Sequence, residues 1–141
     1  MAGKIIEKIK EDVEEVIKKG KEVPKTVRQK VKETVATALE KTEVTGENIK
    51  KLTEEAVKGA VEAVEKAGGK LAEVAHSAAT GAIEAISEAG DKTKGLLKDA
   101  AAGAVKGLEH ALETAKESTK EATEKVKGEL REAIRKIKER F

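Results

Sequence analysis

Apolar and charged residues of this chain alternate with the spacing of an amphipathic helix. Residues 4–19 carry apolar side chains three or four positions apart, and residues 27–39 repeat the spacing. Because residues three and four apart share one face of an α-helix, the pattern predicts two short helices. The apolar positions are Ile5, Ile6, Ile9, Val13, Val16 and Ile17, then Val27, Val31, Val35, Ala38 and Leu39.

Two breaks bound these helices. Gly20 suits the position just after a helix, and Pro24, the only proline, fits the first turn of the next one because it lacks an N–H. We therefore expect a bend near residues 20–24. Residues 42–48 are poor in helix formers and form either a turn with Thr45 as the N-cap or a weak stretch of helix.

A 22-residue repeat fills the rest of the chain. Near-copies of a Gly-Ala-aliphatic segment begin at Gly59, Gly81 and Gly103, each 22 residues after the last. The phase extends back to Thr37 and forward to Lys125. Each unit divides into two elevens, and eleven residues in three turns slightly exceed the ~3.6 residues per turn of a straight helix. The pattern predicts coiled-coil-type packing with a slight right-handed supercoil.

The unbroken phase favours one long helix from about residue 46, since loops of arbitrary length would shift it. Gly46, Gly68 and Gly90 share one position of the repeat and weaken such a helix by roughly 1 kcal/mol each. Gly90-Asp91 could end one helix and cap the next, which leaves a helical hairpin hinged at these residues as the alternative.

The predicted fold class is therefore all-α, in two parts. Residues 1–45 form the short N-terminal helix pair. Residues 46–141 form the hendecad-repeat amphipathic helix, or the helical hairpin.

The repeat separates an apolar face of small residues from a polar face. The polar face is acidic at its centre with lysines along its edges, as in helices that rest on a membrane surface. The same layout suits a helix–helix seam, because Lys and Glu four residues apart stabilise an exposed helix. The predicted self-association or lipid face comprises Ala60, Val64, Ala67, Leu71, Ala78, Ala82, Ile86, Ala89, Leu97, Ala100, Ala104, Leu108 and Ala111, and its edge lysines are Lys50, Lys70, Lys92, Lys94 and Lys116.

These Ala-rich repeats, with lysine edges and glutamate centres, resemble the group 3 late embryogenesis abundant proteins. They are also similar to the exchangeable apolipoproteins and the synucleins. The run Asp91-Lys92-Thr93-Lys94-Gly95-Leu96-Leu97 resembles the Lys-Thr-Lys-Glu-Gly-Val repeat of synucleins. The resemblance covers about residues 50–130. It implies conditional helicity, membrane or partner surfaces, and protection during water loss.

The composition predicts a thin core. Charged residues make up 40% of the chain, yet its net charge is only +2, which is typical of a salt-bridged helix surface. Phe141 is the only aromatic residue, so the side chains that bury most area are scarce. We expect such a face to need a partner chain and predict a homo-oligomer. Weak contact with anionic membranes and with client proteins is also predicted.

No residues are spaced as a catalytic or metal site. His76 and His110 are far apart, and neither belongs to an H-x-x-x-H pair. Glu73 precedes His76 by three residues, as in di-iron bundles, but those sites need two such motifs. Cysteine is absent, and so is a phosphate-binding Gly-x-x-x-x-Gly-Lys-Ser/Thr loop. We therefore predict that the chain is not an enzyme and holds no cofactor or metal.

Other partners and compartments follow from what the sequence lacks. Acidic and basic residues nearly balance and stacking aromatics are missing, so nucleic acid is not expected. No apolar run is long enough for a membrane span or a signal peptide, which predicts a cytoplasmic location.

Three functional hypotheses remain open. The first is a structural or protective protein of the late embryogenesis abundant type, which shields membranes or proteins through its apolar face. The second is a constitutively folded coiled-coil scaffold or assembly module that self-associates. The third is a peripheral membrane-binding helix.

Overall fold

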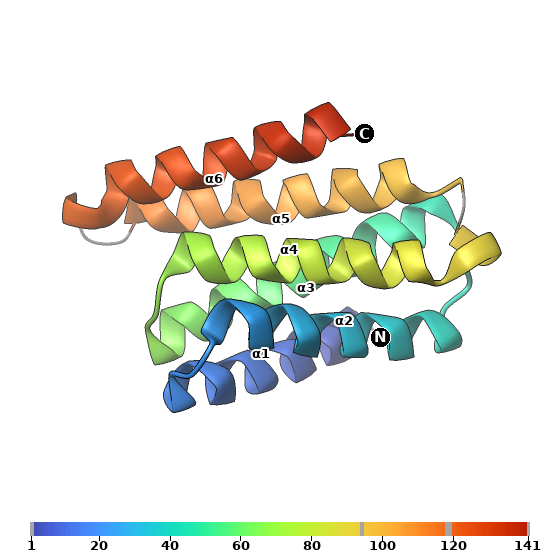
Figure 1. Ribbon diagram of the computed structural model, residues 1–141, viewed down its shortest axis with the longest axis horizontal. Coiled ribbons are helices and arrows are strands. Elements are labelled where there is room, and N and C mark those ends of the chain that lie inside the picture. The colour runs from blue at the N-terminus through green and yellow to red at the C-terminus, as the bar shows by residue number, and fades with distance from the viewer. Residues whose placement is uncertain (1, 94, 118–119, 141) are drawn as a thin grey trace.

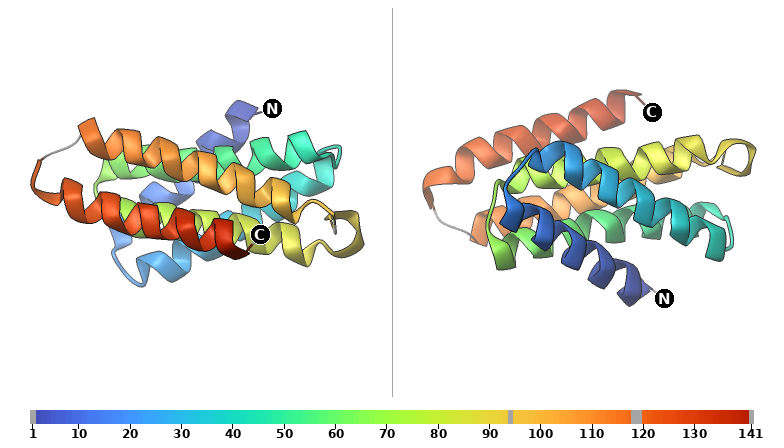
Figure 2. Two further views of the ribbon diagram at one scale, coloured as in Figure 1. Left: turned by 90° about the horizontal axis from the view of Figure 1, so that it is seen from above. Right: turned by 60° about the horizontal axis from the view of Figure 1, so that its bottom comes forward.

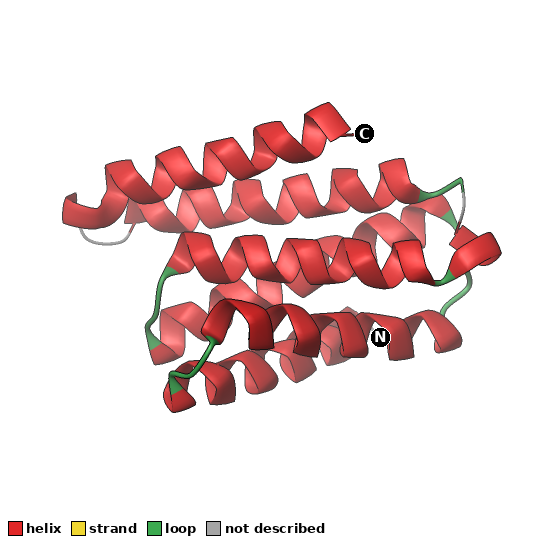
Figure 3. Ribbon diagram, viewed as in Figure 1, coloured by secondary structure: helices red, strands yellow, loops and turns green. Residues whose placement is uncertain are grey.

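In the computed structural model, each apolar stretch of the sequence forms its own helix, and the helices pack side by side (Figure 1). The structure describes residues 2–93, 95–117 and 120–140, without the side chains of residues 2–4, 91–92, 116–117 and 120–123. Helices and loops account for all of the described residues (Figure 3). The elements are α1 (Ala2–Lys19), α2 (Val23–Lys41), α3 (Gly46–Ala67), α4 (Leu71–Glu88), the 3-10 helix η1 (Gly90–Thr93), α5 (Leu97–Glu117) and α6 (Lys120–Arg140).

The predicted all-α class is confirmed, but the long helix is wrong. The described residues between 46 and 140 form four α-helices and the 3-10 helix η1, and the chain breaks at 68–70 as well as near the expected hinge at 90–91. The phase survives because one helix and its loop together occupy about one repeat. Loops that recur once per repeat leave the 22-residue spacing of the apolar positions unchanged. A continuous repeat therefore does not require a continuous helix.

The helices form a two-layered array. Each helix contacts its sequence neighbour in the other layer and the next helix but one in its own layer. One layer therefore holds α1, α3 and α5, and the other holds α2, α4 and α6. Within a layer the helices run parallel, so α4 and α6 point the same way along the long axis (Figures 1 and 2).

The repeat glycines set the spacing within each layer. A Cβ on Gly59 would lie 2.9 Å from the carbonyl oxygen of Ile6, and one on Gly81 or Gly103 would collide with the carbonyl oxygen of Arg28 or Lys50. The three pairs share one sequence separation of 53 residues (6 to 59, 28 to 81 and 50 to 103). The same contact thus recurs along the chain: a glycine of one helix lies directly against the backbone of the helix two places earlier in the sequence.

Beside these glycines, a row of buried valines forms the centre of the core. Val13, Val35 and Val57 follow one another at the 22-residue spacing and are all fully buried. A Cβ on Gly107 would meet the Cβ of Val57 at 2.5 Å, so small residues face this row. One hydrophobic cluster joins helices from both sides of residue 45.

The predicted helix ends are confirmed at the first two loops. Gly20 follows α1 with a φ of 67°, and Pro24 lies in the first turn of α2. Thr45 caps α3, since its Oγ1 accepts a hydrogen bond of 3.1 Å from the backbone N–H of Asn48. Gly68 and Gly90 have φ values of 87° and 74°, which favour glycine. Gly46, the third glycine at this repeat position, begins α3 and does not have a positive φ.

A candidate site in the groove between helices α4 and α6

The apolar face expected to bind lipid or a second chain is mostly covered by the protein's own helices. Eight of its thirteen residues are buried, namely Ala60, Ala78, Ala82, Ile86, Ala100, Ala104, Leu108 and Ala111. The other five are half-buried, namely Val64, Ala67, Leu71, Ala89 and Leu97. In the folded chain this face therefore forms the core.

Two of the five expected edge lysines, Lys50 and Lys70, have side chains that the structure describes. Lys50 is half-buried, and its carbonyl oxygen is the atom that Gly103 approaches. Lys70 is exposed at the start of α4, where its Nζ lies 4.0 Å from a carboxylate oxygen of Glu73. The side chains of Lys92, Lys94 and Lys116 lie outside the described residues.

The array opens at its last helix. The glycine contacts join residues 53 positions apart, so the residue of α6 that should lie against Ala72 of α4 is residue 125. This residue is a lysine and not a glycine. Four residues on, where the preceding helices carry Ala63, Ala85 and Gly107, α6 has Glu129. Both charged residues are exposed and line a groove beside Ala72. Large side chains replace the small pair that close packing requires, and α6 contacts α4 far less than it contacts α5.

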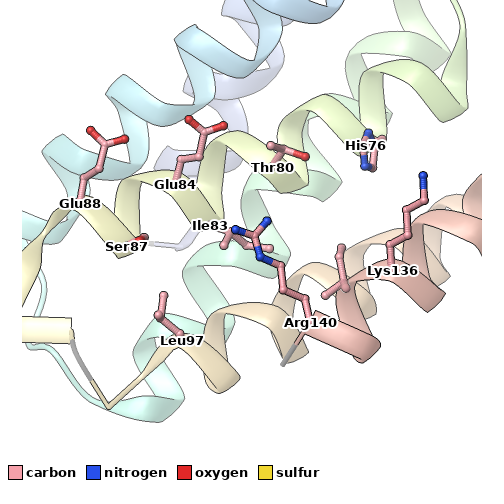
Figure 4. Close-up of a pocket in the computed structure, with 10 residues that line it drawn as sticks. His76, Thr80, Ile83, Glu84, Ser87, Glu88, Leu97, Lys136 and Arg140 are labelled. Carbon is pink, nitrogen blue, oxygen red and sulfur yellow. The ribbon is translucent and has the colours of Figure 1, made fainter.

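The resulting α4–α6 groove runs along both helices in the same register. The end of the groove toward the C-terminus of α6, called the far end here, encloses about 550 Å³ and reaches the start of α5 (Figure 4). The residues lining this end are His76, Thr80, Ile83, Glu84, Ser87, Glu88, Leu97, Lys136, Ile137 and Arg140.

The floor of this end consists of apolar side chains, one of which, on α4, remains partly exposed. Ile83 holds the repeat position of Leu39, Val61 and Val105, which are 9%, 0% and 8% exposed. On α4 the same position is only half-buried, and it lines the groove together with Leu97 and Ile137.

The acidic residues of the rim form salt bridges with basic side chains of α2. Lys32 Nζ lies 2.6 Å from a carboxylate oxygen of Glu88 and 3.9 Å from one of Glu84, and Arg28 Nε lies 3.5 Å from Glu84. The hydrogen bond and charge of Glu88 raise the pKa of Lys32. Figure 4 accordingly shows both carboxylates turned toward α2.

The basic residues of the rim belong to α6 and extend over the gap (Figure 4). The carboxylates of Glu132 and Glu139 pair with Arg135, and no described carboxylate forms a salt bridge with Lys136. Across the groove, desolvation and then the charge of Lys136 hold the pKa of His76 below its usual value. This end therefore combines an apolar floor with a positive rim.

Metal chemistry has no support in the described part of the chain. His76 and Glu73 both line the groove, but no three His, Cys, Asp or Glu side chains gather there closely enough to hold a metal ion. Lys136 and Arg140 belong to the most basic stretch of the sequence, residues 131–140, where the sequence alone allows a small anionic contact. Glu129, Ile137 and the floor residue Ile83 were not singled out from the sequence. Their signal was the charged pair that interrupts the small-residue positions at 125 and 129.

Comparison with known proteins adds no assignment. No protein-family model matches the chain, and neither the comparison with curated proteins nor that with solved structures gives a match. Among the described residues, no helix is both long and apolar enough to span a membrane.

Proposed function

We propose that the chain is a non-enzymatic, constitutively folded helical scaffold that holds a partner molecule in the α4–α6 groove. The observation that carries this proposal is the repeated glycine contact of Gly59, Gly81 and Gly103. It lets the helices bury their apolar face against one another. Since amphipathic helices gain most of their stability from such packing, the chain needs neither a membrane nor a second chain to become helical.

The same observation favours the scaffold over a protective protein of the late embryogenesis abundant type. Shielding a membrane or client through the apolar face requires that face to be accessible. Ala82 and Ala104, at its centre, are fully buried. A protective role would therefore require the array to open first, and a peripheral membrane helix would require the same.

Circular dichroism and light scattering test this proposal on the full chain. We expect high helicity in dilute buffer, a cooperative thermal transition, and no gain in helicity with anionic vesicles. The predicted homo-oligomer is tested in the same samples by the molar mass. Low helicity in buffer that rises on vesicles or on drying would overturn the scaffold and favour the protective or membrane-binding hypothesis.

A further inference from the structure

The far end of the α4–α6 groove combines two features that point to one class of ligand. Its floor offers the half-buried side chains of Ile83 and Leu97, together with Ile137. Its rim offers Lys136, which forms no salt bridge with a described carboxylate, because the nearby Glu132 pairs with Arg135. A ligand that satisfies both is apolar along its length and negatively charged at one end.

The contact between α4 and α6 limits the shape of this ligand. The groove reaches down to Leu97 on α5, between two helices that still contact each other. An α-helix is about 10 Å across with its side chains, too thick to enter between them. A single polymethylene chain is slender enough to reach the floor. The volume of about 550 Å³ also falls in the range of small-molecule sites.

We propose that the groove binds the free carboxylate of a long-chain, single-tailed amphiphile, with its tail on Ile83 and Leu97 and its carboxylate at Lys136. The acidic residues of the rim do not oppose the charge of this head group, because Glu84 and Glu88 pair with Arg28 and Lys32 on α2. Arg140 and His76 flank the same opening (Figure 4). The proposal rests on the folded scaffold, and it specifies the occupant of its groove.

Calorimetric titration of the full chain with dodecanoate below its micellar concentration tests the site. We expect one ligand per chain, with affinity that rises roughly threefold to fourfold for each added methylene until the tail fills the groove. Dodecanol, which has the tail without the charge, should bind roughly tenfold more weakly.

Two charge reversals on α6 form a matched pair. Lys136→Glu should weaken dodecanoate binding by roughly tenfold or more, whereas Lys138→Glu, two residues away and outside the groove, should change it less than about twofold. Ile83→Thr should weaken the binding of dodecanoate and dodecanol alike. Circular dichroism of each variant establishes its folding separately, so failure of the scaffold and failure of the ligand site are distinguishable.

Three results would overturn the site. One is equal weakening by Lys136→Glu and Lys138→Glu in folded variants. Another is binding of many ligands per chain with no preference for dodecanoate over dodecanol. The third is recruitment to anionic vesicles without binding of monomeric dodecanoate, which would assign the positive rim to membrane head groups.

Discussion

Gly103 of α5 lies against the carbonyl oxygen of Lys50 on α3 so closely that a methyl group on the glycine would collide with it. The carbonyl belongs to helical backbone, which cannot move away as a flexible side chain would. Gly81 makes the same contact with Arg28, 22 residues earlier on both sides. Two helices of one layer can therefore approach this closely only because the residue at the contact is glycine.

Gly103→Ala should destabilise the chain for this reason. Forcing a methyl group into a closed contact costs about 1–3 kcal/mol, partly offset by about 1 kcal/mol from the better helix propensity of alanine. Gly128→Ala is the matched control, because nothing lies within 4 Å of the added Cβ. It should stabilise by about 0.5–1 kcal/mol. Urea unfolding measures both, and equal effects in the two variants would contradict the close contact.

The sequence determines more of the interior than of the topology. The apolar spacing identified the buried side of each helix, because the repeat positions of Ala60, Ala82 and Ala104 are all fully buried. It did not reveal that the covering surface belongs to the same chain. That depends on loop lengths, and loops placed once per repeat leave the phase unchanged.

The groove could be predicted only by comparing repeats. Lys125 looks ordinary on a solvated helix, and its effect appears once Gly59, Gly81 and Gly103 are known to face a neighbouring backbone. The floor of the groove depends in addition on which helix follows in the same layer. Periodicity within one helix carries no such information.

Restoring the small pair on α6 should close the groove. Lys125→Gly with Glu129→Ala gives α6 the residue types that the earlier helices present to their neighbours. We expect α6 to move onto α4, and amide hydrogen exchange in α6 to slow as its contacts increase. Lys125→Gly alone is the control. It should lose about 1 kcal/mol of helix stability while Glu129 still holds the helices apart. Exchange that is no slower in the double variant would show that another feature separates α6 from α4.

Acidification should weaken the fold through His76. Its pKa is lowered in the folded chain by desolvation and by Lys136, so below about pH 6.5 the unfolded chain binds more protons. This contribution to stability is complete above that pH and is lost as the pH falls from it through the lower pKa of the folded chain. We expect a small drop in melting temperature between about pH 7.5 and pH 5, reduced in His76→Gln. His110→Gln is the matched control, and an identical pH profile for His76→Gln and the unchanged chain would contradict the assignment.

Two buried threonines should respond oppositely to valine. Thr93 is 1% exposed at the end of η1, and its hydroxyl donates to the carbonyl oxygen of Ile86 near the end of α4. The same carbonyl oxygen accepts a hydrogen bond of 3.3 Å from the backbone N–H of Ala89. Thr53 is fully buried, and its hydroxyl donates at 2.8 Å to the carbonyl oxygen of Ile49, which lies four residues earlier in the same helix.

Valine removes both hydroxyl groups, but only the loss at position 93 removes a hydrogen bond between a helix and the segment that follows it. At position 53 the helix still supplies the backbone N–H to Ile49, and the equivalent position of α2 is already a valine, Val31. Thr53→Val should therefore change the free energy of unfolding by less than about 0.5 kcal/mol or raise it. Thr93→Val should lower it by about 1 kcal/mol, because the end of α4 loses a hydrogen bond that joins it to the loop. Chemical denaturation of the two variants decides the matter, and a Thr93→Val protein as stable as the unchanged chain would remove Thr93 from the contacts that hold this loop.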